Sequence, residues 1–228
     1  MKKFTLVSIF IILFSGLLLK AQIYTENSGE IIFAFSEVER NMQPVDSKMR
    51  FTAFFHIGQN IHYDFTNNFG FFTGFGIRNI GLITKEEDIE IRRRTYSFGI
   101  PLAFKGGSFK DNLFFYGGGE YELFFHYKQK QFIDGTKTKE SEWFSDRTNR
   151  FVPSLFAGIQ FPKGINLKFK YYLDNFLNKD FTGNDFGIPV NYSVFNKTEI
   201  FYFSLSFNIK HEDIKKIYSP SGIRTAFL

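Results

Sequence analysis

The chain has 228 residues, a formal net charge of +5 and no cysteine, and 34 of its residues are phenylalanine. The absence of cysteine excludes both a disulfide framework and a thiolate metal site. So weak a positive excess does not indicate nucleic-acid binding, and we expect no nucleic-acid partner. The roughly 207 residues after an apolar N-terminus suit a single domain.

The first 21 residues have the pattern of a secretory signal peptide rather than of a folded element. Lys2 and Lys3 precede an apolar run over residues 4–19, and Ala21 supplies a small residue before Gln22. The run is shorter than the roughly 20 residues that a spanning helix needs. We therefore predict a signal peptide at 1–21, with an uncleaved anchor as the alternative.

The rest of the chain alternates apolar and polar residues with period two in eight segments, which predicts eight strands. In the last segment Phe203 and Phe207 would face one side while Ser204 and Ser206 face the other, because successive side chains of a strand point to opposite faces. The predicted strands lie in chain order at 30–36, 50–65, 69–83, 91–105, 112–128, 150–161, 165–174 and 198–210.

The connectors between these segments alternate in length. Short connectors are expected at 66–68, 106–111 and 162–164, and longer polar ones at 37–49, 84–90, 129–149 and 175–197. Outer-membrane barrels have short periplasmic turns and longer extracellular loops. We therefore predict an all-β, eight-stranded, antiparallel, up-and-down transmembrane barrel over 22–210, located in the outer membrane, followed by a periplasmic tail over 211–228.

Charged residues fall on the inward face of several predicted strands. Eight strands enclose an interior just wide enough for side chains to fill it, and buried charges are tolerated when they are paired. We expect a structural lumen network of His56, His62, Asp64, Arg78, Lys105, Glu120, Glu122, His126, Lys168, Lys170 and Asp174. The alternative interpretation is a narrow passive pore for ions or small solutes.

An enzyme is the second alternative, and we expect none. His62 and Asp64 lie two apart on one strand face, as Glu120 and Glu122 do on another. Alternation alone places any inward polar pair at that spacing, so the spacing does not indicate a metal site or a catalytic base. The predicted protein is therefore a structural or binding barrel without catalytic residues, metal or cofactor, in which a lipid-modifying activity is disfavoured.

An arginine triplet follows the acidic connector at 86–88. Arg92, Arg93 and Arg94 would stand near the outer rim of the barrel, where guanidinium groups suit the phosphates of lipopolysaccharide. The alternative is a solvated strand end that pairs with its own loop. The triplet is the candidate contact with outer-membrane lipid.

Three short motifs lie in the predicted barrel strands. They are Ile57-Gly58-Gln59-Asn60-Ile61 with Tyr63, Ile100-Pro101-Leu102 leading to Phe104-Lys105, and the run at 117–119 of three glycines. With these motifs the chain resembles the small outer-membrane β-barrels of Bacteroidetes, the PorT-like group. The resemblance implies the barrel fold, an outer-membrane location and a possible partner in the periplasm or in secretion machinery, and it implies no site residues.

Overall fold

A computed structural model describes residues 22–86, 89–133 and 135–210. Most of these residues lie in antiparallel strands, and the only helical elements among them are two single 3-10 turns. No helix in this part of the chain is long and apolar enough to cross a membrane. The predicted signal peptide at 1–21 and the predicted tail at 211–228 lie outside the described residues.

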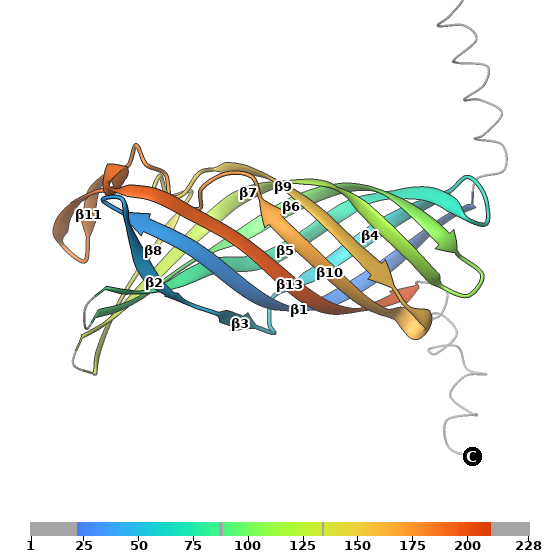
Figure 1. Cartoon of the computed structure of the whole chain (residues 1–228), viewed down its shortest axis with the longest axis horizontal. Helices are drawn as coiled ribbons and strands as arrows, with labels where there is room; N and C mark the ends of the chain where they lie inside the picture. The colour runs from blue at the N-terminus through green and yellow to red at the C-terminus, as the bar shows by residue number, and fades with distance from the viewer. Residues whose placement is uncertain (1–21, 87–88, 134, 211–228) are drawn as a thin grey trace, which may run out of the picture.

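Eight strand positions close into a ring (Figure 1). The ring closes between its first and last strands, which confirms the predicted fold class. Seven positions are single strands, in the order β1 (Gln22–Arg40), β13 (Phe195–Lys210), β10 (Ile165–Tyr172), β9 (Phe151–Gln160), β7 (Leu113–Ile133), β6 (Ile89–Ser108) and β5 (Phe69–Glu86). The eighth is shared by β2 (Gln43–Lys48), β3 (Arg50–Thr52) and β4 (Ile57–Asp64), which join β5 back to β1.

The shared position corrects the prediction of one continuous strand over 50–65. The chain leaves the sheet between β3 and β4, where Phe55 has a φ of 66°. A positive φ interrupts the regular pleat, so the strict alternation of faces does not hold there. An unbroken strand over 50–65 would point Phe54 inward together with His56, but Phe54 is 76% exposed.

The outer face of the ring carries the apolar side chains. On β13, Phe203 and Phe207 are both 52% exposed, whereas Ser204 and Ser206 point inward and are buried. The same alternation holds on β5 and β6, where Phe69, Phe75, Ile100 and Phe104 are exposed. A closed barrel with an apolar exterior suits a bilayer, because the backbone polar groups of its wall are paired within the sheet.

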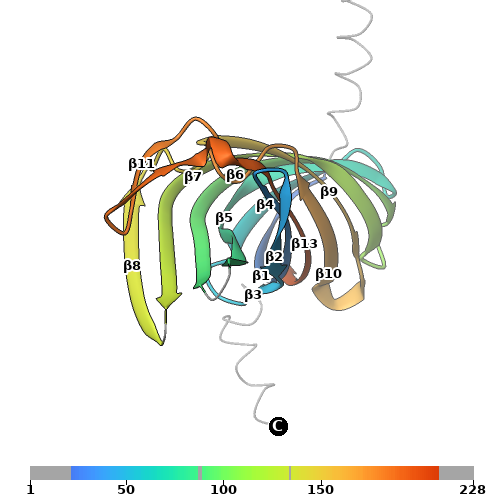
Figure 2. The same ribbon diagram turned by 60° about the vertical axis from the view of Figure 1, so that its left-hand side comes forward.

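The predicted long connectors are largely strands. β7 continues to Ile133 and pairs with β8 (Thr136–Trp143), while β11 (Thr182–Asp185) and β12 (Ile188–Asn191) form a separate hairpin. Figure 2 shows β5 to β8 continuing as one curved sheet past the ring, with the β11 hairpin beside it. The apolar pattern does not reveal these extensions, because both of their faces carry polar residues.

The short connections gather at one end of the barrel. They are the turns at 65–68 and 109–112 and the 3-10 turn η1 (Pro162–Gly164). The start of β1 and the end of β13 lie at the same end (Figure 1). Short turns face the periplasm in outer-membrane barrels. We therefore assign this end to the periplasm and the extended hairpins to the cell exterior.

Candidate functional site

A cluster of six charged side chains fills the middle of the lumen. Arg78 on β5 contacts Glu120 on β7 and lies 3.1 Å from Glu30 on β1. Lys168 on β10 is 2.7 Å from the other oxygen of Glu30. Lys170, also on β10, is 2.7 Å from Glu120 and contacts Glu122. The central cluster is defined as Glu30, Arg78, Glu120, Glu122, Lys168 and Lys170.

The central cluster balances its own charge. Three carboxylates face three cations, and the Tyr172 hydroxyl donates to Glu122 at 2.9 Å. The side chains of Glu122 and Lys170 are fully buried. Buried charges are stable only when paired and hydrogen-bonded. Because the charges cancel locally, the cluster has the character of a cross-brace between four strands rather than of an ion-binding site.

A smaller group of ion pairs lies toward the periplasmic end. Lys105 is 2.6 Å from Asp64 and donates to the Tyr24 hydroxyl at 2.8 Å. The ring of His62 stacks on Tyr24 with centroids 4.7 Å apart, and its Nε2 is 3.3 Å from Glu26. His62 Nδ1 is also 3.0 Å from the Lys105 ammonium, which can only donate, so Nδ1 accepts and Nε2 carries the proton.

Two apolar clusters lie on either side of the central cluster. The periplasmic one contains Phe72, Ala103, Phe114, Tyr116 and Phe156. The exterior one is larger and includes Ile80, Leu82, Phe124, Val152, Leu177 and Ile200. The interior is therefore less polar than the sequence indicated. A cavity of about 40 Å³ remains, lined in part by Tyr116, Arg78 and Lys168, which is room for only a few waters.

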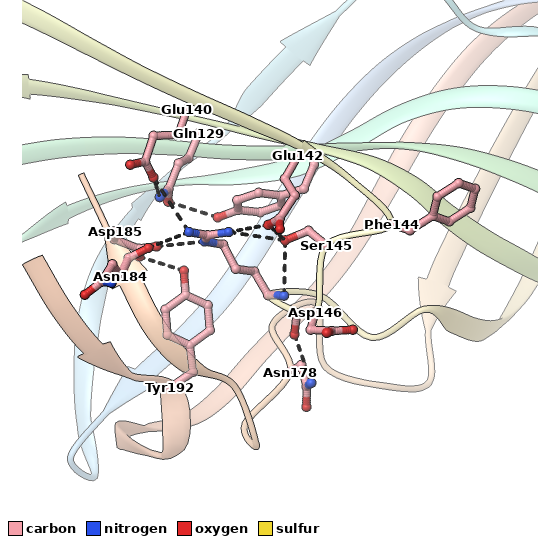
Figure 3. Close-up of polar contacts among 12 residues, drawn as sticks. Gln129, Glu140, Glu142, Phe144, Ser145, Asp146, Asn178, Asn184, Asp185 and Tyr192 are labelled. Carbon is pink, nitrogen blue, oxygen red and sulfur yellow. Dashed lines mark hydrogen bonds and ion pairs between the residues drawn. The ribbon is translucent and has the colours of Figure 1, made fainter. Parts of the chain in front are cut away.

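At the exterior end, Arg147 ties the two extended hairpins together. Figure 3 shows Glu142, Asn184 and Asp185, which surround its guanidinium. Its guanidinium lies 2.8 Å from Asp185 on β11 and also contacts Glu142 on β8 and the carbonyl oxygen of Asn184. The Tyr192 hydroxyl donates to the other oxygen of Asp185 at 2.8 Å. Burial raises the pKa of Tyr192 to about 12, so this phenol stays protonated as a donor at neutral pH.

The arrangement around Arg147 closes the mouth of the barrel. Phe181 packs edge-on against Tyr192, and the Arg147 guanidinium lies over the Phe181 ring at 4.9 Å. Tyr192 and Phe195 belong to the exterior apolar cluster. We refer to residues 181–192 as the cap. The cap is thus continuous with the barrel interior and leaves the lumen covered from outside.

Nine of the eleven predicted lumen residues point inward. His56 reaches the interior from the β3–β4 connection, where its Nδ1 accepts from the Asn79 backbone N–H at 3.2 Å. The others are His62, Asp64, Arg78, Lys105, Glu120, Glu122, Lys168 and Lys170. The prediction was wrong for Asp174, which lies just beyond the end of β10 and is exposed.

The prediction was also wrong for His126. Tyr96 pairs with His126 but its neighbour Ser97 pairs with Phe124, so Phe125 is an extra residue in β7. Such a bulge shifts the alternation by one residue. Tyr127 and Gln129 are therefore buried, while His126 stacks on Trp143 on the outer face.

The arginine triplet is divided between the two faces of β6. Arg93 is buried, with its guanidinium 3.0 Å from the Thr84 hydroxyl and 3.8 Å from Glu86. Arg92 and Arg94 lie on the outer face. β6 begins at Ile89, so all three arginines lie within a strand whose side chains point alternately to its two faces. The three guanidinium groups therefore cannot bind one ligand together.

Sequence reasoning missed Glu26 because it began the first strand at residue 30, and it did not include Glu30, the first residue of that strand, in the lumen network. β1 starts at Gln22, and its inward residues Tyr24, Glu26 and Glu30 supply partners to Lys105, His62 and Arg78. These inward residues have even spacing in the sequence. The alternation of apolar and polar residues is weak there, because Thr25, Asn27 and Gly29 on the opposite face are not strongly apolar.

Within the residues that the structure describes, no group of three or more His, Asp or Glu side chains is arranged to hold a metal ion. The closed ring, the apolar exterior and the filled lumen define the class of the protein. It is a small eight-stranded β-barrel of the outer membrane.

Comparison with known proteins gives likeness in fold alone. No family model matches the chain, and no curated protein sequence matches it. Among solved structures it is similar to the Yersinia pestis attachment invasion locus protein Ail, bound to the heparin analogue sucrose octasulfate (16% identity, 82% of this chain, 99% of that chain, TM-score 0.39). Neisserial surface protein A is 10% identical over 83% of this chain and 97% of that chain, with a TM-score of 0.40. AlkL in lipid bilayers is 13% identical over 82% of this chain and 90% of that chain, with a TM-score of 0.39. At these scores the fold assignment rests on the strand pairing itself.

Proposed function

We propose that the protein is a sealed outer-membrane barrel with a structural and binding role, rather than a pore. The observation that supports this is the layered filling of the lumen. The neutral central cluster lies between two apolar clusters, and the cap covers the exterior mouth. A solute crossing the barrel would have to separate buried ion pairs and displace buried aromatic rings.

The energetic cost of opening this path is large. Removing one partner of a buried ion pair typically costs about 3–5 kcal/mol, because an uncompensated charge remains. A passing ion would separate at least the Lys170–Glu122 and Arg78–Glu120 contacts. The binding role then belongs to the surfaces of the barrel, above all to the hairpins that extend to the exterior (Figure 2).

The test is conductance of the purified protein in planar bilayers. We expect no discrete conductance steps from protein whose folding is verified by the different migration of the boiled and unboiled barrel on an SDS gel. A variant lacking part of the cap, Phe181→Ala with Tyr192→Ala, controls for a seal made by the cap alone. Steps of constant size in the wild-type protein would show a pore and overturn the proposal.

Two finer assignments stay predictions. The resemblance to the PorT-like group rests on the motifs around Ile57, Ile100 and Gly117 and implies a periplasmic or secretion-machinery partner. The partner is tested by crosslinking in intact cells, followed by capture of the tagged barrel and identification of what is attached. Recovery of outer-membrane lipid without any protein at stoichiometric amounts would count against a docking role for the periplasmic end.

A further inference from the structure

One row of aromatic rings lies on the outer face of β6, β7 and β8. Tyr96 pairs with His126, and His126 pairs with Trp143. The ring centroids are 5.7 Å apart in the first pair and 4.1 Å apart in the second. Phe55 packs edge-on against Tyr96 at 6.1 Å. Tyr and Trp side chains concentrate at the membrane–water interface of barrels, so this row marks the outer boundary of the bilayer.

Basic residues occupy the next two rows toward the exterior. Arg94 pairs with Lys128 in the first row. Arg92 pairs with Lys130 in the second, and Lys130 pairs with Lys139 of β8. Strands rise about 3.3 Å per residue and tilt by about 40° in outer-membrane barrels, so these rows lie about 5 and 10 Å beyond the aromatic row along the membrane normal. The headgroup region is about 5–8 Å thick on each side of a bilayer, so the first row lies within it and the second at its outer margin.

The register brings like charges face to face. Arg92, Lys130 and Lys139 are directly opposite one another across three adjacent strands. Like charges in direct cross-strand pairs destabilise a sheet. Desolvation, with the neighbouring Arg94 and Lys137, lowers the pKa of Lys130. Without a ligand, this arrangement therefore destabilises the sheet, and a bound anion would offset that destabilisation.

Among the residues that the structure describes, this face carries little counter-charge. Within the described residues, Glu90 is the carboxylate in ion-pair contact with these cations, at 2.7 Å from Arg92 and 2.6 Å from Lys48. We define the outer basic face as Lys48, Arg92, Arg94, Lys128, Lys130 and Lys139.

A groove borders this face on the side of β3. Its volume is about 490 Å³, and its lining combines the cations Arg92, Arg94 and Lys130 with the apolar side chains Met49 and Phe51. Phe51 is 57% exposed. A site with cations toward the exterior and apolar surface toward the bilayer matches an amphipathic ligand. A soluble anion would gain nothing from contact with the apolar side chains of the groove.

We propose that the outer basic face binds the phosphate groups of a phosphorylated lipid of the outer leaflet, whose acyl chains lie along the apolar belt below the aromatic row. The inference deepens the proposed binding role and depends on the same membrane orientation. It also corrects the arginine-triplet hypothesis. Arg92 and Arg94 contribute from β6, but their partners are lysines of β7 and β8, and the guanidinium of Arg93 is buried inside the barrel.

The experiment titrates the purified full-length barrel in zwitterionic detergent with bisphosphorylated lipid A. The chain has a single tryptophan, and Trp143 lies in the aromatic row beside the site, so its fluorescence reports occupancy. Retention of lipid A with the protein on size-exclusion chromatography is the second measurement. Dephosphorylated lipid A and inorganic phosphate are titrated in parallel to separate the lipid from the free anion.

The matched variants each remove two lysines. Lys128→Gln with Lys130→Gln changes the outer basic face, whereas Lys110→Gln with Lys163→Gln changes two exposed lysines at the periplasmic turns. A basic residue near an anionic membrane surface contributes about 1 kcal/mol, so the first pair should weaken binding about 30-fold. The second pair should bind as the wild type does. Single Lys130→Gln replaces the double variant if the latter does not fold.

The outcomes separate the possibilities. Saturable binding that requires lipid phosphates, weakens with salt and depends on Lys128 and Lys130 supports the proposal. Equal binding of dephosphorylated lipid A, equal binding by both variants, or no binding in either measurement overturns it. Binding of inorganic phosphate as tight as that of lipid A would also overturn it, by identifying a soluble anion. Conductance by the barrel would refute the sealed lumen and leave this result unaffected.

Discussion

Lys170 and Glu122 form an ion pair in which both side chains have no solvent exposure, although they lie 48 residues apart on β10 and β7. Glu120, at 2.7 Å from the same ammonium, joins the pair to Arg78 and so to β5. The charged cluster thus connects strands that are not neighbours in the barrel wall. Its contribution should therefore be measurable as stability of the whole ring.

Replacing Lys170 with Met should destabilise the barrel by about 3–5 kcal/mol, because two buried carboxylates lose their shared cation. The free energy of unfolding is measured by urea titration of the barrel folded into lipid vesicles. Lys197→Met is the control, since Lys197 pairs with Glu37 at the exposed end of β13 and its loss should leave the midpoint unchanged. Equal midpoints for the two variants would show that the central cluster is not a brace.

Gly118 should not tolerate a side chain. A Cβ at this position would lie 2.0 Å from the Leu102 carbonyl oxygen and 2.6 Å from Ala103 Cα, both backbone atoms of β6. The backbone would have to move, so Gly118→Ala should cost about 1–3 kcal/mol. Gly117→Ala is the matched control, because its Cβ would meet only the Phe156 carbonyl oxygen at 3.6 Å. The same urea titration distinguishes them, and equal stability would refute the close approach of β6 and β7.

The ring of eight strands could be predicted from the sequence because a barrel in lipid imposes the same alternation on every strand. Phe203 and Ser204 show the rule at its clearest, with the first 52% and the second 3% exposed. The rule holds wherever the outer face meets apolar surroundings. Beyond the aromatic row both faces of the strands carry polar residues, so the apolar alternation does not identify strands there. For this reason the β7–β8 hairpin was predicted as a loop.

The candidate site was predictable only in part, for two physical reasons. A single extra residue at Phe125 reverses the facing of everything after it on β7, and nothing in the local composition reveals a bulge. Cross-strand partners also depend on register and shear, so the pairing of Lys168 with Glu30 could not be deduced from facing alone. The sequence shows the arginines at 92–94 as a triplet. The basic residues that share the outer face could be identified only from the register of β6, β7 and β8.

The apolar belt predicts a difference between two exposed apolar residues. Phe203→Arg should destabilise the barrel by roughly 2–4 kcal/mol, the cost of Arg near the bilayer midplane. Ile188→Arg should be tolerated, although Ile188 is 62% exposed, because β12 lies in the cap outside the bilayer. Folding titrations in vesicles measure both. A harmless Phe203→Arg would mean that this face of β13 does not meet lipid.

Arg147 should hold the cap in place. Arg147→Met removes the contacts with Asp185, Asn184 and Glu142, so the β11–β12 hairpin should open more often. Hydrogen exchange followed by mass spectrometry should show faster exchange in peptides covering 182–191. Arg150→Met is the matched control, because Arg150 contacts Asp146 at 3.1 Å on the exposed surface. Unchanged exchange in the Arg147 variant would mean that apolar packing alone holds the cap.

The orientation of the barrel predicts which ends can be labelled on intact cells. The chain has no cysteine, so single-cysteine variants give no background with a membrane-impermeant maleimide. Thr136→Cys lies at the start of β8 and Lys110→Cys in the β6–β7 turn, and both positions are exposed in the protein. Short turns face the periplasm, so Thr136→Cys should be labelled and Lys110→Cys should react only after the outer membrane is permeabilised. Labelling of Lys110→Cys alone on intact cells would reverse the barrel, and would place the outer basic face at the periplasmic leaflet, where it could not meet an outer-leaflet lipid.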